Sequence, residues 1–84
     1  MLPEAIKHFF WEYQGDIDLE KYRFFIIERL LEYGDFKAIK WALERYGEEC
    51  LIEVVKGSRL ISPQTASMWQ NYYGLKREEI RCLN

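Results

Sequence analysis

Apolar residues recur along most of the chain with the spacing of one helix face. Near the N-terminus they stand three or four positions apart, at Ile6, Phe9, Phe10 and Tyr13. They follow Pro3, a residue that suits the first turn of a helix. The pattern therefore predicts a helix from Pro3 to about Gln14 that is ended by Gly15.

The next predicted helix is the most apolar of the chain. Asp16 or Asp18 can cap its start. Two apolar stripes follow, one made of Leu19, Tyr22, Ile26, Leu30 and Tyr33 and the other of Phe24, Ile27 and Leu31. Because these stripes cover more than half of the circumference, we expect this helix to lie at the centre of the fold. Gly34 is expected to end it in a left-handed conformation.

Two shorter helices are predicted between Asp35 and Gly57. Asp35 serves as the N-cap of the first, which ends at Gly47 and bears the apolar residues Phe36, Ile39, Leu43 and Tyr46. The second begins with Glu48 and Glu49, whose negative charges suit the positive end of a helix dipole. Its expected inner face consists of Leu51, Val54 and Val55.

The clearest helix boundary in the sequence is Ser62-Pro63, an N-cap followed by proline at the first helical position. It predicts a fifth helix from Pro63 to about Tyr73 that ends at Gly74, with inward-facing Ala66, Trp69 and Tyr73. A short sixth helix from Arg77 to Leu83 would present Ile80 and Leu83 to the core. No segment alternates in the manner of a strand, so the expected fold class is all-α.

Length and composition place these helices in one domain over residues 1–84. A chain of 84 residues is too short for two hydrophobic cores. Its 49% hydrophobic and 17% aromatic content excludes intrinsic disorder. We therefore predict an all-α, compact single domain of five or six short helices, with a helix-turn-helix-like pair near the C-terminus.

Charge is unevenly distributed along the chain. Residues 1–55 carry 7 basic and 12 acidic side chains, a net charge of −5, whereas residues 56–84 carry 5 basic and 2 acidic ones, a net charge of +3. The overall net charge of −2 predicts neither a nucleic-acid nor a membrane partner by itself. From Leu60 to Leu75 no residue is charged, and such neutrality is typical of the core of a protein interface.

The sequence offers little for catalysis or metal binding. Its one histidine, His8, stands beside aromatic residues, and its two cysteines, Cys50 and Cys82, have no zinc-motif spacing. Acidic pairs coincide with predicted helix starts, where capping explains them. We therefore expect no enzyme activity, catalytic residue, metal or cofactor. We also expect a cytoplasmic protein with reduced cysteines, because no apolar run is long enough to span a bilayer and no secretory signal is present.

Two interpretations of the fifth predicted helix remain open. In the first, it docks a protein partner or a second copy through the anchor candidates Met68, Trp69, Tyr72 and Tyr73, of which Trp69 is expected to face inward. In the second, it is the recognition helix of a homodimeric helix-turn-helix protein that reads DNA. Side chains suited to base edges and phosphates would then make the contacts, namely Arg59, Gln64, Ser67, Asn71, Lys76 and Arg77. The acidic chain weakens the second interpretation, because basic residues supply most DNA affinity.

Four segments form a distinctive combination: FWEY at 10–13, FIIERLLEYGD at 25–35, SRLISPQTA at 58–66 and REEIRCL at 77–83. Together they resemble a family of small all-helical prokaryotic proteins of uncharacterised function, whose members are often encoded beside abortive-infection-type nucleotidyltransferase toxins. The chain departs from that pattern at Lys76, where proline is usual, and at Tyr72-Tyr73, where aliphatic residues are usual. The resemblance implies a non-enzymatic, antitoxin-like binding module that masks such a toxin.

Overall fold

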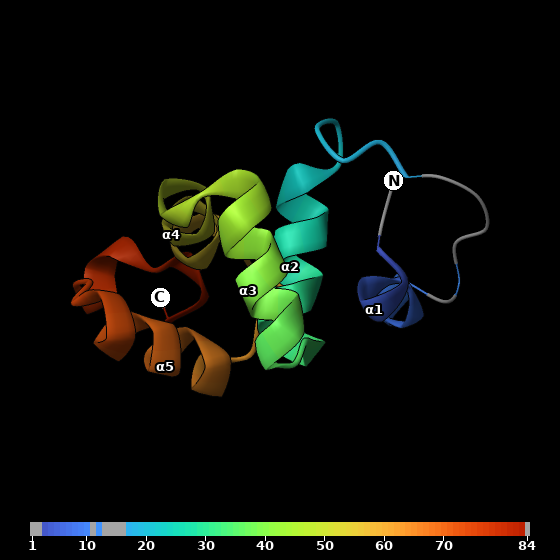
Figure 1. Ribbon diagram of the computed structural model, residues 1–84. Coiled ribbons are helices and arrows are strands. Elements are labelled where there is room, and N and C mark those ends of the chain that lie inside the picture. The colour runs from blue at the N-terminus through green and yellow to red at the C-terminus, as the bar shows by residue number, and fades with distance from the viewer. Residues whose placement is uncertain (1–2, 11, 13–16, 84) are drawn as a thin grey trace.

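The computed structural model of the protein describes residues 3–10, 12 and 17–83, and these form helices and turns (Figure 1). The α-helices are α1 Glu4–Lys7, α2 Arg23–Tyr33, α3 Phe36–Tyr46, α4 Glu48–Gly57 and α5 Pro63–Tyr73. Three 3-10 turns accompany them, η1 His8–Phe10, η2 Arg77–Glu79 and η3 Arg81–Leu83. No strand occurs within the described residues, which confirms the all-α class.

Helix α2 lies at the centre of the fold, as its apolar stripes predicted. Helix α2 contacts α3, α4 and the turn η1, and α1 also contacts α3. One hydrophobic core joins all the α-helices. Its buried residues are Ile6, Phe10, Ile26, Ile27, Leu30, Leu31, Ala38, Ala42, Leu51, Val54, Val55, Ile61, Ala66, Trp69 and Ile80.

The first predicted helix is shorter than its sequence pattern indicates. One α-helical turn, α1, passes directly into the 3-10 turn η1, and Ile6 and Phe10 are buried. Arg29 connects this segment to α2. Its Nη1 donates a hydrogen bond to the Phe9 carbonyl oxygen at 3.2 Å and forms an ion pair with Glu12. The rest of the expected helix, with Tyr13, Gln14, Gly15 and the alternative cap Asp16, falls outside the described residues.

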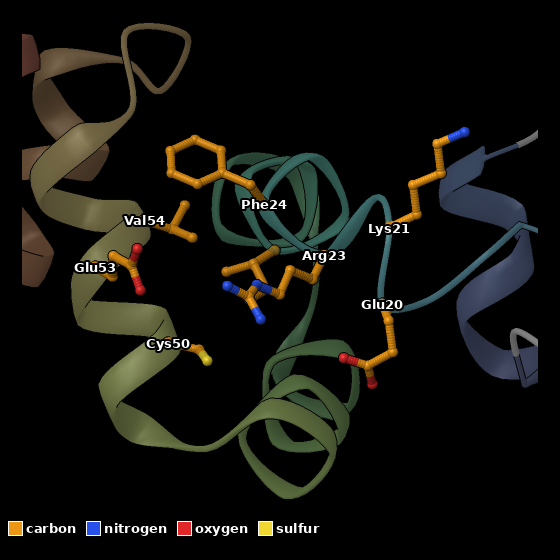
Figure 2. Close-up of a pocket in the computed structure, with 8 residues that line it drawn as sticks. Glu20, Lys21, Arg23, Phe24, Cys50, Glu53 and Val54 are labelled. Atoms are coloured by element: carbon orange, nitrogen blue, oxygen red, sulfur yellow. The ribbon is translucent and has the colours of Figure 1, made fainter.

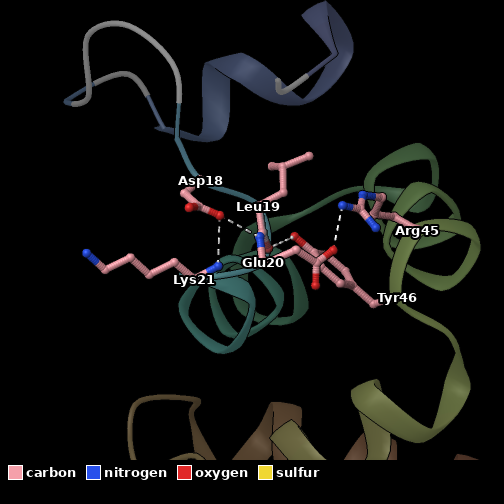
Figure 3. Close-up of polar contacts among 6 residues, drawn as sticks. All are labelled: Asp18, Leu19, Glu20, Lys21, Arg45 and Tyr46. Carbon is pink, nitrogen blue, oxygen red and sulfur yellow. Dashed lines mark hydrogen bonds and ion pairs between the residues drawn. The ribbon is translucent and has the colours of Figure 1, made fainter.

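Helix α2 begins four residues later than the apolar stripe predicted. Leu19 and Tyr22 lie in a turn, because the Asp18 carboxylate accepts hydrogen bonds from the backbone N–H groups of Glu20 and Lys21, both at 3.0 Å. Figure 3 shows this turn held against α3. The hydroxyl of Tyr46 donates to the Leu19 carbonyl oxygen, and Arg45 pairs with Glu20. Asp18 therefore caps a turn that precedes the helix.

Gly34 is not left-handed, contrary to prediction. Its φ of −74° and ψ of 158° are extended values that any residue can adopt. The position is crowded instead, because a Cβ there would clash with the Leu30 carbonyl oxygen and lie 3.1 Å from the Ala38 Cβ. Asp35 is the predicted N-cap of α3, since its carboxylate accepts from the Ala38 N–H at 2.9 Å. The backbone of the last turn of α2, together with Ala38 of α3, thus leaves no room for a side chain at Gly34.

Helix α3 meets the core with its smallest residues. Ala38 and Ala42 are fully buried, whereas Phe36, one of the four apolar residues in the predicted pattern, is 83% exposed. The other three residues of that pattern are half-buried, namely Ile39, Leu43 and Tyr46. Ala38 and Ala42, and not Phe36 at the first residue of the helix, therefore form the part of α3 that meets the core. The expected inner face of α4, formed by Leu51, Val54 and Val55, is confirmed by burial.

The predicted sixth helix is two separate 3-10 turns. Ile80, which lies between them, has an extended backbone at φ −103° and ψ 109°, and this interrupts any continuous helix. The interruption lets the Ile80 side chain enter the core, where it is fully buried as predicted. It also brings the Cys82 thiol within hydrogen-bond reach of the Ile61 carbonyl oxygen. The turn η3 contacts both α5 and α4, and η2 contacts η3.

Candidate functional site

Helix α5 has the boundaries that the sequence predicted. The Ser62 hydroxyl accepts from the Thr65 N–H at 3.2 Å, and Pro63 occupies the first turn. At the other end Gly74 is left-handed, with φ 64°, and the Leu75 N–H donates to the Gln70 carbonyl oxygen. This is the hydrogen-bond pattern of a Schellman C-cap. Both ends are therefore fixed by local sequence.

Two glutamates of α2 hold the segment that leads into α5. The buried Ser58 hydroxyl donates to Glu28 Oε2 at 2.6 Å and accepts from the backbone N–H groups of Leu60 and Ile61. One helical turn further on, Glu32 Oε1 accepts from the Ser62 N–H at 2.9 Å. Burial opposes ionisation of Glu32, yet hydrogen bonds from Ser62 and Thr65 lower its pKa overall. Contacts with α2 therefore set the direction in which α5 starts.

The outward face of α5 is a continuous uncharged stripe. It consists of Gln64, Ser67, Met68, Asn71 and Tyr72, which recur at helical spacing and are all exposed. We call these five residues the α5 stripe. Met68 is 54% exposed and Tyr72 is 71% exposed, so neither completes the core. The stripe thus combines two large apolar side chains with three polar, uncharged ones.

The inward face of α5 carries an aromatic cluster that supports the stripe. Trp69 is 7% exposed, as predicted, and stacks on Tyr73 at 5.7 Å between ring centroids. Tyr72 meets both rings edge-on, at 5.5 Å from Trp69 and 4.9 Å from Tyr73. Burial, with smaller effects of Glu48 and Tyr72, raises the pKa of Tyr73. Of the four anchor candidates, Met68 and Tyr72 are therefore presented outward, and Trp69 and Tyr73 contact the Tyr72 ring.

The residues of the DNA-binding interpretation are all exposed, but they lie in separate places. Gln64, Ser67 and Asn71 belong to the α5 stripe, Arg59 precedes the helix, and Lys76 and Arg77 follow it. The Arg77 guanidinium donates to the Leu83 carbonyl oxygen at 3.3 Å. Another basic residue near the helix, Lys56, lies 3.9 Å from the Glu79 carboxylate. The cations thus stand at the two ends of the helix, with none on its outward face.

A cavity of about 240 Å³ between α2 and α4 shows no catalytic arrangement. Figure 2 shows Arg23 of α2 and Cys50 and Glu53 of α4 pointing into it. A nucleophilic thiol needs a neighbouring base, and the described lining includes no histidine. His8 lines a different cavity, of about 370 Å³, beside Tyr33. Neither described lining combines a cysteine or serine with a histidine.

Sequence reasoning missed the part played by Glu28 and Glu32 and the exposure of Tyr33, Phe36 and Leu60. The two glutamates stand one turn apart on a mostly apolar helix, and that spacing is the signal that the sequence offers. Tyr33 had been placed in an inner stripe of the central helix. Its position at the last residue of α2 exposes it instead.

Comparison with known proteins gives a match to one family model. Residues 5–55 match a family described as being of unknown function, DUF6922. No curated protein and no solved structure matches the chain. Within the described residues, no helix is long and apolar enough to cross a membrane, and no three His, Cys, Asp or Glu side chains are grouped to hold a metal ion. The α5 stripe lies beyond the matched residues.

Proposed function

We propose that the chain, which belongs to the DUF6922 family of unknown function, is a non-enzymatic binding module that docks another protein through the α5 stripe. The observation that carries this proposal is the exposure of Met68 and Tyr72 on an uncharged helix face. Methionine and tyrosine are enriched in protein interfaces, and charged residues are depleted at their cores. A helix face of this kind suits a groove on the partner.

The packing beneath the stripe favours tight docking. The Tyr72 ring is held by edge-on contacts with Trp69 and Tyr73, so little side-chain freedom remains to be lost when a partner covers it. The capped ends of α5 fix the backbone in the same way. Anchors that are ordered before binding contribute more net affinity than mobile ones.

We propose further that the partner is a nucleotidyltransferase-type toxin encoded beside this chain, which the chain would mask as an antitoxin. The support is the resemblance carried by the four sequence segments described above. Masking by an antitoxin needs a stable protein surface and no catalytic group of its own. The α5 stripe supplies a surface of that kind.

Co-expression with the adjacent open reading frame tests this proposal. A stable complex should form with the wild-type chain, and Met68→Ala with Tyr72→Ala should disrupt it without unfolding the protein. Truncation of a buried interface anchor costs about 2 kcal/mol or more of binding. Lys37→Ala, at an exposed position of α3, is the matched control and should leave the complex intact. Failure to co-purify, or a neighbour that is no toxin, would refute the antitoxin role.

A second candidate function is sequence-specific DNA binding by a helix-turn-helix homodimer. It is favoured by the exposure of Gln64 and Asn71 on one face of α5, because both side chains can pair with adenine edges. Helices α4 and α5 would form the motif, with residues 58–62 as its turn. Arg59 and Lys76, at the two ends of α5, would contact phosphates.

Binding measurements with DNA separate this candidate from protein docking. If α5 reads DNA, Gln64→Ala and Asn71→Ala should relax sequence preference. Arg59→Ala should weaken binding to all sequences alike and reduce the salt slope by about one unit. Absence of any binding at low salt would eliminate the candidate, and equal losses from every substitution would leave nonspecific attraction only.

A further inference from the structure

We propose that a cavity between α2 and residues 58–60 is a second binding site, which receives an arginine or lysine side chain of a protein partner. The cavity has a volume of about 260 Å³ and is lined by Phe25, Glu28, Arg29, Glu32, Tyr33 and Leu60. This volume lies below the roughly 300–1,000 Å³ of typical small-molecule sites, so it suits a single side chain. The inference does not depend on docking through the α5 stripe.

The buried Glu28 carboxylate is the main reason to expect a cationic ligand. Glu28 is 8% exposed. Among the described residues, its carboxylate accepts a hydrogen bond from Ser58 Oγ. No lysine or arginine of the described chain forms an ion pair with it. A carboxylate removed from water usually has a cationic partner, because one neutral hydrogen bond offsets its lost hydration only in part. A second carboxylate, Glu32, lines the same cavity.

Arg29 lines the cavity but is engaged elsewhere. Its Nη1 donates to the Phe9 carbonyl oxygen and pairs with Glu12, on the N-terminal segment. Its guanidinium also lies 4.9 Å from the Phe25 ring centroid and 5.4 Å from that of Phe10. The hydrogen bond, the ion pair and the Phe10 contact direct its charge toward the N-terminal segment, whereas Phe25 lies in the cavity lining. The lining therefore keeps an excess of negative charge, which an incoming cation would complement.

The rim of the cavity fits the stem of such a side chain. Tyr33 is exposed and Leu60 is 75% exposed, although both are large and apolar. The aliphatic part of an arginine or lysine can pack against such residues while its charged end reaches a carboxylate. A guanidinium or ammonium group can also interact with the tyrosine ring. Apolar rims around a carboxylate thus select a long cationic side chain over a free metal ion.

Nuclear magnetic resonance titration tests the site with small probes. N-acetyl-L-arginine amide should shift the backbone amide resonances of Ser58, Leu60 and Ser62 in a saturable manner. N-acetyl-L-citrulline amide, which has nearly the same shape and no charge, should bind roughly tenfold or more weakly, because a charge-assisted contact is lost. Equal binding of the two probes, or no saturable shift with either, would overturn the proposal.

Variants of the lining residues test whether the arginine amide binds in this cavity. Glu28→Gln keeps an acceptor for Ser58 and should weaken arginine amide binding roughly tenfold, whereas Glu44→Gln, at an exposed position of α3, should not change it. If Glu28→Gln does not fold, Leu60→Ser at the exposed rim provides the same test and should weaken binding several-fold. Unchanged binding in the folded variants would overturn the site. Shifts of the same resonances with protein concentration alone would assign the cation to a second copy and exclude a separate partner.

Discussion

Individual hydrogen bonds with the central helix α2 fix the segment at which α5 begins. Glu32 is the clearest case, because its carboxylate accepts a hydrogen bond from the backbone N–H of Ser62, the N-cap residue of α5. The hydrogen bonds lower its pKa despite the opposing effect of burial. The folded protein therefore favours the ionised form of Glu32 more than the unfolded chain does.

This preference predicts a pH-dependent contribution to stability. Because the folded-state pKa of Glu32 lies below its ordinary value of 4.5, the contribution is complete above that value and is lost as pH falls through the folded pKa. Glu32→Gln should lower the free energy of unfolding by about 0.5–1 kcal/mol at neutral pH and by less near about pH 3. Urea unfolding at both pH values measures this difference. Glu53→Gln, at an exposed position, is the control and should change the free energy of unfolding little at neutral pH.

Glycines show which residue-scale features can be predicted from sequence. Gly74 was correctly placed at a helix end that needs a positive φ, because the signal lies within the helix itself. Gly34 was placed at a helix end for the wrong reason. Its requirement comes mainly from the Leu30 carbonyl oxygen in the last turn of α2, with the Ala38 Cβ of α3 also close, and the apolar pattern does not specify this crowding.

The two glycines should therefore respond differently to substitution. At Gly34 both alanine and asparagine should destabilise the fold by about 1–3 kcal/mol, because any Cβ meets the Leu30 carbonyl oxygen. At Gly74 the surroundings are open, and asparagine should be tolerated better than alanine because it adopts positive φ more readily. Thermal melts of the alanine and asparagine variants at both positions measure these changes in stability. Tolerance of asparagine at Gly34 would contradict the steric explanation.

At the scale of elements, helices with both ends marked in the sequence were predicted well. The starts of α3 and α5 agree with the caps Asp35 and Ser62, and α4 begins at Glu48 as predicted. The start of α2 was missed, because the capped turn at Asp18 continues the apolar spacing of the helix without being helical. The C-terminal segment failed similarly, since burial of Ile80 favours an extended residue over a continuous helix.

The cap of α5 gives a direct test at this scale. Ser62→Ala removes the acceptor for the Thr65 N–H and should cost about 1 kcal/mol of stability, within the usual range of roughly 0.5–2 kcal/mol. Ser67→Ala, on the exposed α5 stripe, is the control and should change the melting temperature little. If Ser62→Ala leaves the melting temperature unchanged, the start of α5 and the register of the stripe would have to be revised.

At the scale of the whole molecule, the sequence identified the region of the candidate site but not its full composition. The uncharged run from Leu60 to Leu75 coincides with α5 and its exposed stripe. Helical periodicity also predicted that Trp69 faces inward. The cavity at Glu28 could not be predicted, because it joins residues thirty positions apart in the sequence. Such contacts depend on how the helices pack.

The affinity of the co-purified partner protein at two salt concentrations tests docking through the α5 stripe most directly. We expect the wild-type affinity to change little with salt, because the stripe is uncharged. Met68→Ala with Tyr72→Ala should weaken binding by about 2 kcal/mol or more, while Lys37→Ala should not. Binding that the double variant leaves unchanged, or that weakens steeply with salt as phosphate contacts do, would contradict the account.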